Sequence, residues 1–336
     1  MSEPLLEVRD LSVDIVLSRG TIHAVDGVSF ALEAGAAMGL VGESGCGKSM
    51  TLRGILGLLP RTGRITGGQV LFEGKDLVKG GQRGLREVRG GGISIIFQEP
   101  MTALNPVMRV GDQIAEGPRH HLGWSRSQSR ARALELMRMV GIPDPERRMR
   151  AYPHELSGGL RQRVMIAIAL SSEPKLILCD EPTTALDVTI QDQILKLLLG
   201  LRRDLGVAIV FVTHDLAVIA QTCETLAVMY AGRVVETGRV EQMFREPHHP
   251  YTLGLLRSVP DFDAVRDSLE AIPGMPPDLA STFSACRFAP RCQFAQDDCL
   301  AGEVDLHEID GGRTVACLHD DACAAAASAD PVIARV

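Results

Sequence analysis

Short runs of apolar residues, each followed by a polar or glycine-rich segment, recur along this chain and indicate buried strands. They cover residues 36–41, 93–97, 176–179 and 207–213. Stretches with helical character lie between them, at residues 51–59, 127–142 and 161–170. Gly141 and Pro143 mark the end of the second of these helices. Because strands that alternate with helices favour a parallel sheet, the pattern predicts an α/β fold.

The balance of strand and helix signals changes along the chain and predicts its organisation. Strand signals dominate residues 1–97, and helix signals dominate residues 99–170. Strands and helices alternate over residues 171–255. We therefore expect one α/β domain over residues 1–255, which contains a helical subdomain at about residues 99–170. An extension over residues 256–336 follows, and its alanine-rich stretch at residues 324–331 predicts disorder.

A phosphate-binding loop is predicted between the first strand run and the first helix. Its sequence, GESGCGKS at residues 42–49, fits the P-loop pattern G-x-x-x-x-G-K-S/T in the required strand–loop–helix context. The glycines allow the backbone to wrap around phosphates, the lysine reaches the β- and γ-phosphates, and the serine supplies a ligand to Mg²⁺. The residues predicted to contact the nucleotide are Gly42, Glu43, Ser44, Gly45, Cys46, Gly47, Lys48, Ser49 and Met50.

Four polar residues follow the other strand runs, at the sheet edge where open α/β folds bind ligands. Asp180 suits Mg²⁺ coordination, and Glu181 is placed to polarise an attacking water. Gln98 can touch both the metal and the nucleophile, and His214 can sense a γ-phosphate. Taken alone, each of them could be an ordinary loop or capping residue, but their order and spacing predict a phosphoryl-transfer site. Its predicted catalytic residues are Gln98, Glu181 and His214, and its predicted Mg²⁺ ligands are Ser49, Gln98 and Asp180.

A second phosphate-binding surface is predicted at LSGGLRQ, residues 156–162. A serine hydroxyl, two glycines that expose backbone N–H groups and the positive start of a helix all favour phosphate there. Because the chain already has a P-loop, the simplest use of this surface is to close on ATP held by another subunit. The sequence therefore predicts an ATPase that works by dimerising, with the turn at residues 185–187 at the dimer seam. The predicted contacts of this second surface are Ser157, Gly158, Gly159, Gln162 and Asp187.

Taken together, these motifs resemble the nucleotide-binding subunit of an ATP-binding cassette (ABC) transporter. Longer segments are similar to the ATPases of oligopeptide/dipeptide importers, at residues 98–114, 152–163, 180–195, 248–256 and 272–279. The resemblance implies a P-loop NTPase fold with an ABC-type nucleotide-binding domain, in which a mixed sheet and a helical subdomain precede a small C-terminal extension. On this resemblance, residues 42–49 are the Walker A loop, Gln98 is the Q-loop and residues 156–162 are the signature. Asp180 and Glu181 are the Walker B pair, and His214 is the switch histidine.

The same resemblance implies a peripheral subunit on the cytoplasmic face of the inner membrane that hydrolyses ATP to power uptake of di- or oligopeptides. Its expected partners are a second homologous ATPase in a head-to-tail heterodimer, two transmembrane permease subunits and an extracytoplasmic peptide-binding protein. Importers of nickel complexes or glutathione share these motifs, so the cargo stays open. A soluble ABC ATPase that acts on ribosomes or DNA, and a regulatory subunit that only binds nucleotide, are the alternatives.

The segment upstream of the P-loop departs from the family pattern. ABC ATPases commonly stack the adenine on an early aromatic residue, but residues 13–27 contain no Phe, Tyr or Trp. Candidate replacements are Val16, the stem of Arg19, His23 and Val25. By analogy with aromatic pairs, stacking is worth ~1 kcal/mol, so we expect weaker base selectivity rather than loss of activity.

Charge and hydropathy narrow the class of function. The net charge is −7 and the pI is near 5.7, which gives no case for general nucleic-acid binding. Apolar runs stay shorter than the ~18–20 residues that span a bilayer, and the first residues lack the layout of a signal peptide. We therefore expect a subunit that is soluble by itself and needs separate membrane proteins for transport.

Five of the eight cysteines lie in the expected extension, between Cys286 and Cys323. Four of them are separated by five, six and seventeen residues: Cys286, Cys292, Cys299 and Cys317. Without an export signal we expect reduced thiols rather than disulfides. Structural zinc sites usually have shorter spacings, and this run matches neither common ferredoxin pattern of iron–sulfur proteins. From spacing alone, zinc, an iron–sulfur cluster and free thiols all remain open.

The resemblance adds a preference among these three. Peptide-importer ATPases of this type carry a similar tail, and some hold a 4Fe–4S cluster there. The resemblance therefore implies a 4Fe–4S cluster, as a structural staple or a redox sensor, with Cys323 free. Its implied ligands are Cys286, Cys292, Cys299 and Cys317.

Overall fold

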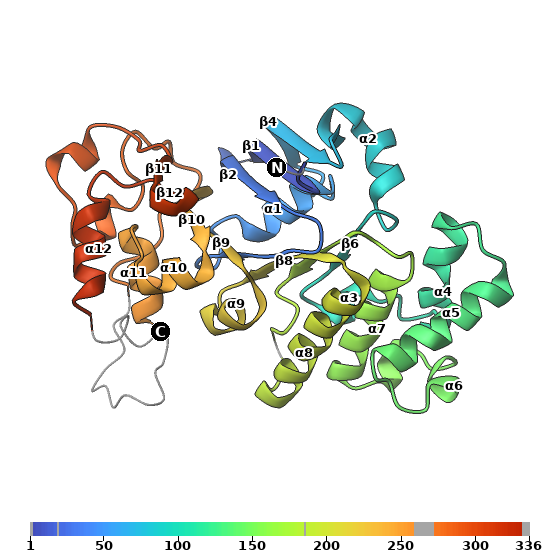
Figure 1. Cartoon of the computed structure of the whole chain (residues 1–336). Coiled ribbons are helices and arrows are strands. Elements are labelled where there is room, and N and C mark those ends of the chain that lie inside the picture. Colours follow the sequence, from blue (N-terminus) through green and yellow to red (C-terminus); the bar gives the residue numbers. More distant parts are fainter. Residues whose placement is uncertain (1–2, 19, 185, 259–271, 331–336) are drawn as a thin grey trace. The chain divides into compact units, whose positions relative to one another are not determined.

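The computed structural model describes residues 3–18, 20–184, 186–258 and 272–330 (Figure 1). The chain divides into two compact units. Within those ranges, the P-loop unit comprises residues 1–32, 37–77 and 213–336. The signature unit comprises residues 33–36 and 78–212. Each unit has its own strands, helices and buried apolar residues.

An antiparallel sheet in the P-loop unit packs on the helix that follows the P-loop. Its strands, in the spatial order β2-β1-β4-β5, are Gly20–Leu32, Leu6–Leu17, Gly63–Phe72 and Lys75–Asp76. In β1, buried Leu6 and Val8 flank a less buried Glu7, as in a sheet with one covered face. Further along β1, Leu11 and Val13 are fully buried and approach Gly54 of helix α1 (Lys48–Ile55), where the missing side chain leaves room for them.

A second, mixed set of strands in the P-loop unit includes the carboxyl-terminal part of the chain. β3 (Ala37–Val41) is parallel to β9 (Thr225–Tyr230), and β9 is antiparallel to β10 (Arg233–Arg239). β12 (Arg313–Val315) and β11 (His307–Ile309) continue the set beyond β10, also antiparallel. The helices that accompany these strands are α9 (Leu216–Thr222), α10 (Val240–Arg245), α11 (Pro250–Arg257) and α12 (Asp320–Ser328), with short 3-10 turns at Ala289–Arg291, Asp297–Leu300 and Asp310–Gly312.

The signature unit is built on parallel strands that are buried. β6 (Ile93–Ile96) pairs with β7 (Leu176–Asp180), and β7 pairs with β8 (Ala208–Thr213). β7 and β8 are buried along their whole length, which explains why they appear in the sequence as uninterrupted apolar runs. The helices are α2 (Leu77–Val88), α3 (Pro100–Ala103), α4 (Val110–His121), α5 (Arg126–Met139), α6 (Pro145–Arg148), α7 (Gly158–Leu170) and α8 (Val188–Leu205), with a 3-10 turn at Pro153–Glu155. Helices α4, α5 and α7 pack against one another (Figure 1).

The predicted fold class is confirmed: the chain combines α/β strand order, a mixed sheet, a group of packed helices and a C-terminal extension. The four predicted strand runs are β3, β6, β7 and β8. The predicted helix at 127–142 is α5, which begins at a capping box of Ser125 and Gln128. Within the described ranges, none of the helices combines the length and the hydropathy that crossing a bilayer requires.

The prediction of disorder at residues 324–331 is wrong for residues 324–328, and Pro331 lies outside the described residues. Residues 320–328 form α12, and Cys323, Ala324 and Ala327 are buried along it. Alanine is the best helix former, and its small side chain allows α12 to pack closely against α11. An ion pair between Arg257 Nε and Asp330 Oδ2, at 2.7 Å, joins the same two segments. Composition alone suggested disorder because it does not show which surface the alanines cover.

A buried carboxylate fixes the start of α11. Glu236 lies on β10 and is fully buried. Its Oε1 accepts the backbone N–H of His248 (2.9 Å), and its Oε2 accepts that of His249 (3.0 Å). Burial raises the pKa of this carboxyl group. The side chain therefore replaces hydrogen bonds that these two N–H groups cannot make within the helix.

We expect Glu236→Gln to destabilise the protein by about 1–3 kcal/mol, because one buried N–H would then face an amide NH₂ group. The measurement is the free energy of unfolding in urea. The control is Glu241→Gln on the exposed face of α10, where the ion pair with Arg245 is worth about 0–1 kcal/mol. Equal effects of the two substitutions would contradict the role given to Glu236.

Candidate functional site

The P-loop is packed closely against neighbouring backbone in the P-loop unit. A Cβ atom at Gly42 would lie 2.1 Å from the carbonyl oxygen of Met229, and one at Gly47 would lie 2.3 Å from that of Ala24. Both glycines have positive φ angles, +154° and +110°, which strain other residues. Gly42 and Gly47 are therefore required for the loop to fold beside β9 and β2.

Lys48 is buried at the first position of α1, and its ammonium group is held inside the loop. Nζ donates hydrogen bonds to the carbonyl oxygens of Gly42 (2.7 Å) and Glu43 (3.0 Å). Ser49 and Met50 follow in the first turn of α1, where N–H groups and the helix dipole favour anions. The lysine and the helix start thus form an anion-binding arrangement.

The remaining P-loop residues differ in exposure. Ser44 and Gly45 are exposed at the tip of the loop, whereas Cys46 is buried. Burial raises the pKa of the Cys46 thiol. The exposed tip is accessible to a ligand, and the cysteine fills space inside the loop.

His214 belongs to the P-loop unit and is exposed just after the end of β8. Thr213 Oγ1 accepts the N–H of Asp215 (3.0 Å), and Asp215 Oδ1 accepts the N–H of Ala217 (2.9 Å) at the start of α9. These hydrogen bonds hold the backbone on the carboxyl-terminal side of His214. The predicted switch histidine therefore lies on an ordered turn.

The structure brings three predicted site residues of the signature unit together at the end of β7. Asp180 is the buried last residue of β7. The N–H of Glu181 donates to the carbonyl oxygen of Val212 (2.9 Å), which continues the ladder between β7 and β8. Glu181 Oε2 accepts hydrogen bonds from Gln98 Nε2 (3.0 Å) and Thr184 Oγ1 (2.8 Å). The carboxylate of Glu181 is thereby oriented by two neighbouring side chains.

The signature segment of the same unit begins α7. Ser157 is the N-cap, and its Oγ accepts the N–H of Leu160 (3.4 Å). Gly158 and Gly159 are the first two residues of the helix, and Ser157 and Gly158 are exposed. This is the arrangement that the sequence predicts for a phosphate-binding helix start.

Gln162 and Asp187 connect elements within the signature unit. Gln162 is buried, and its Nε2 donates to the carbonyl oxygen of Pro182 (2.6 Å), which joins α7 to the segment after Glu181. Asp187 caps α8, because its Oδ1 accepts the N–H of Ile190 (2.9 Å). Their contacts with a partner's nucleotide stay predictions. Ala185, in the predicted seam turn, lies outside the described residues.

The four cysteines of the predicted cluster line one pocket of the P-loop unit, the cysteine pocket: Cys286, Cys292, Cys299 and Cys317. Backbone N–H groups of Phe294 and His319 donate to the sulfur atoms of Cys292 (3.3 Å) and Cys317 (3.4 Å). Burial raises the pKa of the Cys292 thiol and raises that of Cys317 to about 12. None of the eight cysteines, all of which lie in the described ranges, forms a disulfide bond in the structure.

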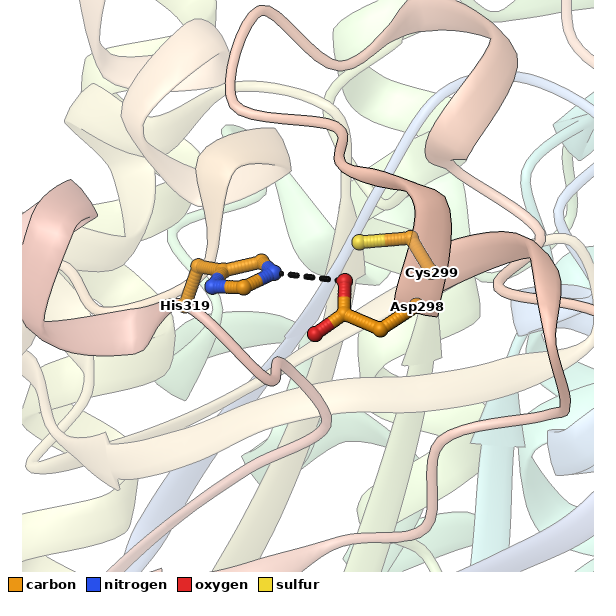
Figure 2. A group of neighbouring side chains, drawn as sticks. All are labelled: Asp298, Cys299 and His319. Carbon is orange, nitrogen blue, oxygen red and sulfur yellow. Dashed lines mark hydrogen bonds and ion pairs between the residues drawn. The ribbon is translucent and has the colours of Figure 1, made fainter.

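A hydrogen bond joins two of the segments that line the cysteine pocket (Figure 2). His319, which follows Cys317 by two residues, has its Nε2 2.9 Å from Oδ1 of Asp298. This contact lowers the pKa of the Asp298 carboxyl group. The ligand atoms of Asp298, Cys299 and His319 all lie within 4.8 Å of one another. The pair therefore holds the segment of Cys317 against the turn that carries Cys299.

Comparison with known proteins finds matches both in the part of the chain that contains the P-loop and in the C-terminal part. The ABC transporter family model matches residues 25–184, and the model of the oligopeptide/dipeptide transporter C-terminal region matches residues 235–299. The chain is 50% identical over 315 residues to a probable peptide ABC transporter ATP-binding protein, y4tR, of Sinorhizobium fredii, covering 93% of this chain and 94% of that protein. It is 47% identical to the oligopeptide transport ATP-binding protein OppD of Bacillus subtilis, covering 95% and 90%.

The chain belongs to the oligopeptide/dipeptide branch of the ABC transporter ATPases. Solved structures agree with this assignment. A bacterial ABC transporter cassette, MJ0796, solved as a dimer, has a TM-score of 0.63 at 28% identity and covers 70% of this chain and 98% of its own. The cassette cbiO1 from Clostridium perfringens has a TM-score of 0.61 at 30% identity and covers 72% and 91%. Both cover a smaller share of this chain than of themselves, so this ABC ATPase has a region beyond the cassette.

The structure narrows the candidates for adenine contact in this ABC ATPase. Val25 is 1% exposed and is not available to a ligand. Val16 is 40% exposed, and His23 is half-buried with its Nδ1 2.8 Å from Asp14 Oδ1. Arg19 lies outside the described residues. Contact of the base with Val16 or His23 stays a prediction.

The sequence did not identify three residues that hold predicted site residues of this ABC ATPase in place. Thr184 donates to Glu181, Tyr251 Oη accepts the N–H of Glu43 (2.7 Å), and Arg291 binds the carboxylate of Glu43. Thr184 lies within one turn of Glu181, so local geometry could have suggested it. Arg291 is 248 positions from Glu43 in sequence, and no local pattern could have identified that pair.

We expect Gln162→Leu to lower kcat about tenfold, while binding of MgATP to the P-loop of the same chain stays unchanged. The carbonyl of Pro182 would lose its buried donor, and a positioning loss of about 1.4 kcal/mol corresponds to that factor. The measurement is steady-state ATP hydrolysis by the assembled transporter together with nucleotide binding. The control is Gln193→Leu on the exposed part of α8, and a normal kcat for Gln162→Leu would contradict the role given to this bond.

Proposed function

We propose that this protein hydrolyses MgATP to drive uptake of di- or oligopeptides through partner membrane subunits. The observation that carries the proposal is the oriented carboxylate of Glu181, which accepts hydrogen bonds from Gln98 and Thr184 directly after Asp180. A base at this position is what ATP hydrolysis requires. The relatives at 47–50% identity are named as peptide transport ATP-binding proteins, which supports a peptide cargo.

In this proposal, the P-loop and the start of α1 bind the phosphates of ATP. The Lys48 ammonium exchanges carbonyl oxygens for phosphate oxygens, because both are hydrogen-bond acceptors at the same loop. Ser49, Gln98 and Asp180 hold Mg²⁺, whose charge compensates that of the phosphates. This ligand set of hydroxyl, amide and carboxylate oxygens suits a hard cation.

Hydrolysis then depends on Glu181 and His214. Glu181 accepts a proton from, or polarises, the attacking water, and Gln98 keeps its carboxylate in place. His214, on its ordered turn, donates to the γ-phosphate and so distinguishes ATP from ADP. Both roles require a bound γ-phosphate, as the target of the water that Glu181 activates and as the acceptor of the hydrogen bond from His214.

A second, homologous ATPase subunit completes the site in this proposal. Ser157, Gly158 and Gly159 at the start of α7 bind the γ-phosphate held by the partner's P-loop, and the partner's signature binds the nucleotide of this chain. Asp187 and the exposed Val188, at the start of α8, lie at the dimer seam. The dimeric structures of the MJ0796 cassette support this arrangement.

Membrane partners complete the transporter. We propose an ABC domain over residues 1–255, in which the helical subdomain at about residues 99–170 faces two permease subunits, and an extension over residues 256–336. The protein then lies peripherally on the cytoplasmic face of the membrane, and an extracytoplasmic binding protein delivers the cargo. Peptides are the favoured cargo because of the named relatives, with nickel complexes or glutathione as the alternatives.

We expect Glu181→Gln to reduce ATP hydrolysis at least about 100-fold, because the amide cannot accept a proton from water. Binding of MgATP should stay intact, since the P-loop is unchanged. The measurement is phosphate release and nucleotide binding by the assembled transporter. Glu135→Gln, on the exposed face of α5, is the control. Unchanged hydrolysis by Glu181→Gln would defeat the assignment.

We further propose that the cysteine pocket holds a 4Fe–4S cluster, on Cys286, Cys292, Cys299 and Cys317. The pocket fits such a group, because it brings four thiols together and two backbone N–H groups donate to their sulfur atoms. A single zinc ion, with Zn–S bonds of about 2.3 Å, needs sulfur atoms within about 4 Å of one another. Among the described residues, the group whose ligand atoms lie within 4.8 Å of one another consists of Asp298, Cys299 and His319. It therefore includes only one of the four cysteines. A cluster would cross-link the segments of the extension and add a redox-active group.

We expect the chain purified without oxygen to contain about four iron and four sulfide per molecule. Cys292→Ser should lose both, whereas Cys323→Ala, which removes a buried thiol outside the lining of the pocket, should keep them. The measurements are iron and acid-labile sulfide analyses. One zinc without sulfide, or no metal at all, would contradict the cluster.

A further inference from the structure

The second residue of the P-loop is held by the C-terminal extension. Both carboxylate oxygens of Glu43 accept hydrogen bonds from Arg291, with Nη1–Oε2 at 2.7 Å and Nη2–Oε1 at 2.9 Å. The backbone N–H of Glu43 donates to Tyr251 Oη (2.7 Å), and its carbonyl oxygen accepts from Lys48 Nζ (3.0 Å). A planar guanidinium bound at two points fixes both the position and the orientation of the carboxylate.

Arg291 is itself locked in place. Its side chain is 4% exposed, and Nε donates to the carbonyl oxygen of Pro273 (2.8 Å). Its guanidinium carbon lies 5.8 Å from the centre of the Tyr230 ring and 5.9 Å from that of Phe288. Because a buried charge needs its partner, the Arg291–Glu43 pair specifies one arrangement of the P-loop against the extension.

The turn that carries Arg291 also lines the cysteine pocket. Arg291 ends the 3-10 turn Ala289–Arg291, between Cys286 and Cys292. The N–H of Ala289 donates to the carbonyl oxygen of Cys286 (3.1 Å), and that of Cys292 donates to the carbonyl oxygen of Ala289 (3.2 Å). Cys286, Ala289 and Cys292 all line the pocket. A shift of these cysteines must therefore move the backbone of Arg291.

A second arginine of the cysteine segment reaches the P-loop by another route. Arg287, next to Cys286, donates to the carbonyl oxygen of Ala231 (2.6 Å) and pairs with Asp26. Gly232, which directly follows Ala231, donates its N–H to the carbonyl oxygen of Cys46 in the P-loop (2.9 Å). Two connections thus run from the segment between Cys286 and Cys292 to the P-loop, one to Glu43 and one to Cys46.

We propose that Arg291 is a positioning residue for ATP binding, which fixes the P-loop through Glu43 and makes nucleotide affinity depend on the state of the cysteine pocket. This inference rests on the proposed ATP binding at the P-loop. It does not depend on which group the cysteines hold, because any change that displaces Cys286 or Cys292 is transmitted by the same turn. In this proposal, the extension controls the affinity of the P-loop for nucleotide.

The test measures the dissociation constant of a fluorescent ATP analogue with Mg²⁺ for the full chain and its variants. We expect Arg291→Ala to weaken binding about tenfold and Arg291→Lys, which keeps the charge but not the two-point contact, to weaken it less. Glu43→Gln should weaken binding similarly, and the double variant should be no worse than either single variant. If the two substitutions instead loosened the extension in general, their effects on the dissociation constant would add.

The matched control is Arg313→Ala. Arg313 is a second buried arginine of the extension, but its guanidinium donates to the carbonyl oxygen of Asp310 and to the backbone and carboxylate of Glu246, at the end of α10. Its loss should leave ATP affinity unchanged. Normal affinity in Arg291→Ala, or additive effects of Arg291→Ala and Glu43→Gln, would overturn the proposal.

The link between the cysteine pocket and the P-loop is tested with Cys292→Ser, and Cys323→Ala is the control. We expect Cys292→Ser to weaken binding of the analogue by a factor similar to that of Arg291→Ala, and the combination of both to add little. Unchanged affinity in Cys292→Ser would overturn the link between the pocket and the P-loop. Failure of the unmodified chain to bind the analogue would instead refute the proposed ATP binding, so the two failures are distinguishable.

Discussion

Close backbone packing around the P-loop is the constraint on which the nucleotide site depends. Side chains at Gly42 and Gly47 would collide with the carbonyl oxygens of Met229 and Ala24. The loop can therefore lie this close to β9 and β2 only with glycine at both positions, and Lys48 directly after Gly47 is buried. Van der Waals exclusion at two glycines thus determines where the phosphate-binding groups lie.

Buried polar side chains then select one arrangement of the elements around that loop. Glu236 binds the backbone at the start of α11, Arg291 binds Glu43, and Gln162 binds the carbonyl of Pro182. An unsatisfied buried polar group costs about 1–3 kcal/mol, so alternative packings that break these bonds are disfavoured. The apolar residues supply most of the driving force, but they are less specific about orientation.

Several features could be predicted because they depend on short stretches of sequence. Strands β7 and β8 are buried on both faces and therefore appear as continuous apolar runs. The end of β7 carries Asp180 and Glu181, as expected for residues at the carboxyl edge of a parallel sheet. Helix α12 was missed, since its alanines gain their burial from contact with α11, which composition does not reveal.

The sequence by itself indicated the α/β fold class, the P-loop pattern and the strand end at Asp180 and Glu181, because each depends on the periodicity, glycines and polar residues of a short stretch. The ABC family was indicated by the resemblance of several such motifs taken together. Only the tertiary structure decided that Gln98 orients Glu181, that four dispersed cysteines share one pocket and that Arg291 reaches Glu43. Such contacts join residues that are far apart along the chain. They exist only once separate elements have packed, and no local pattern records how distant segments will meet.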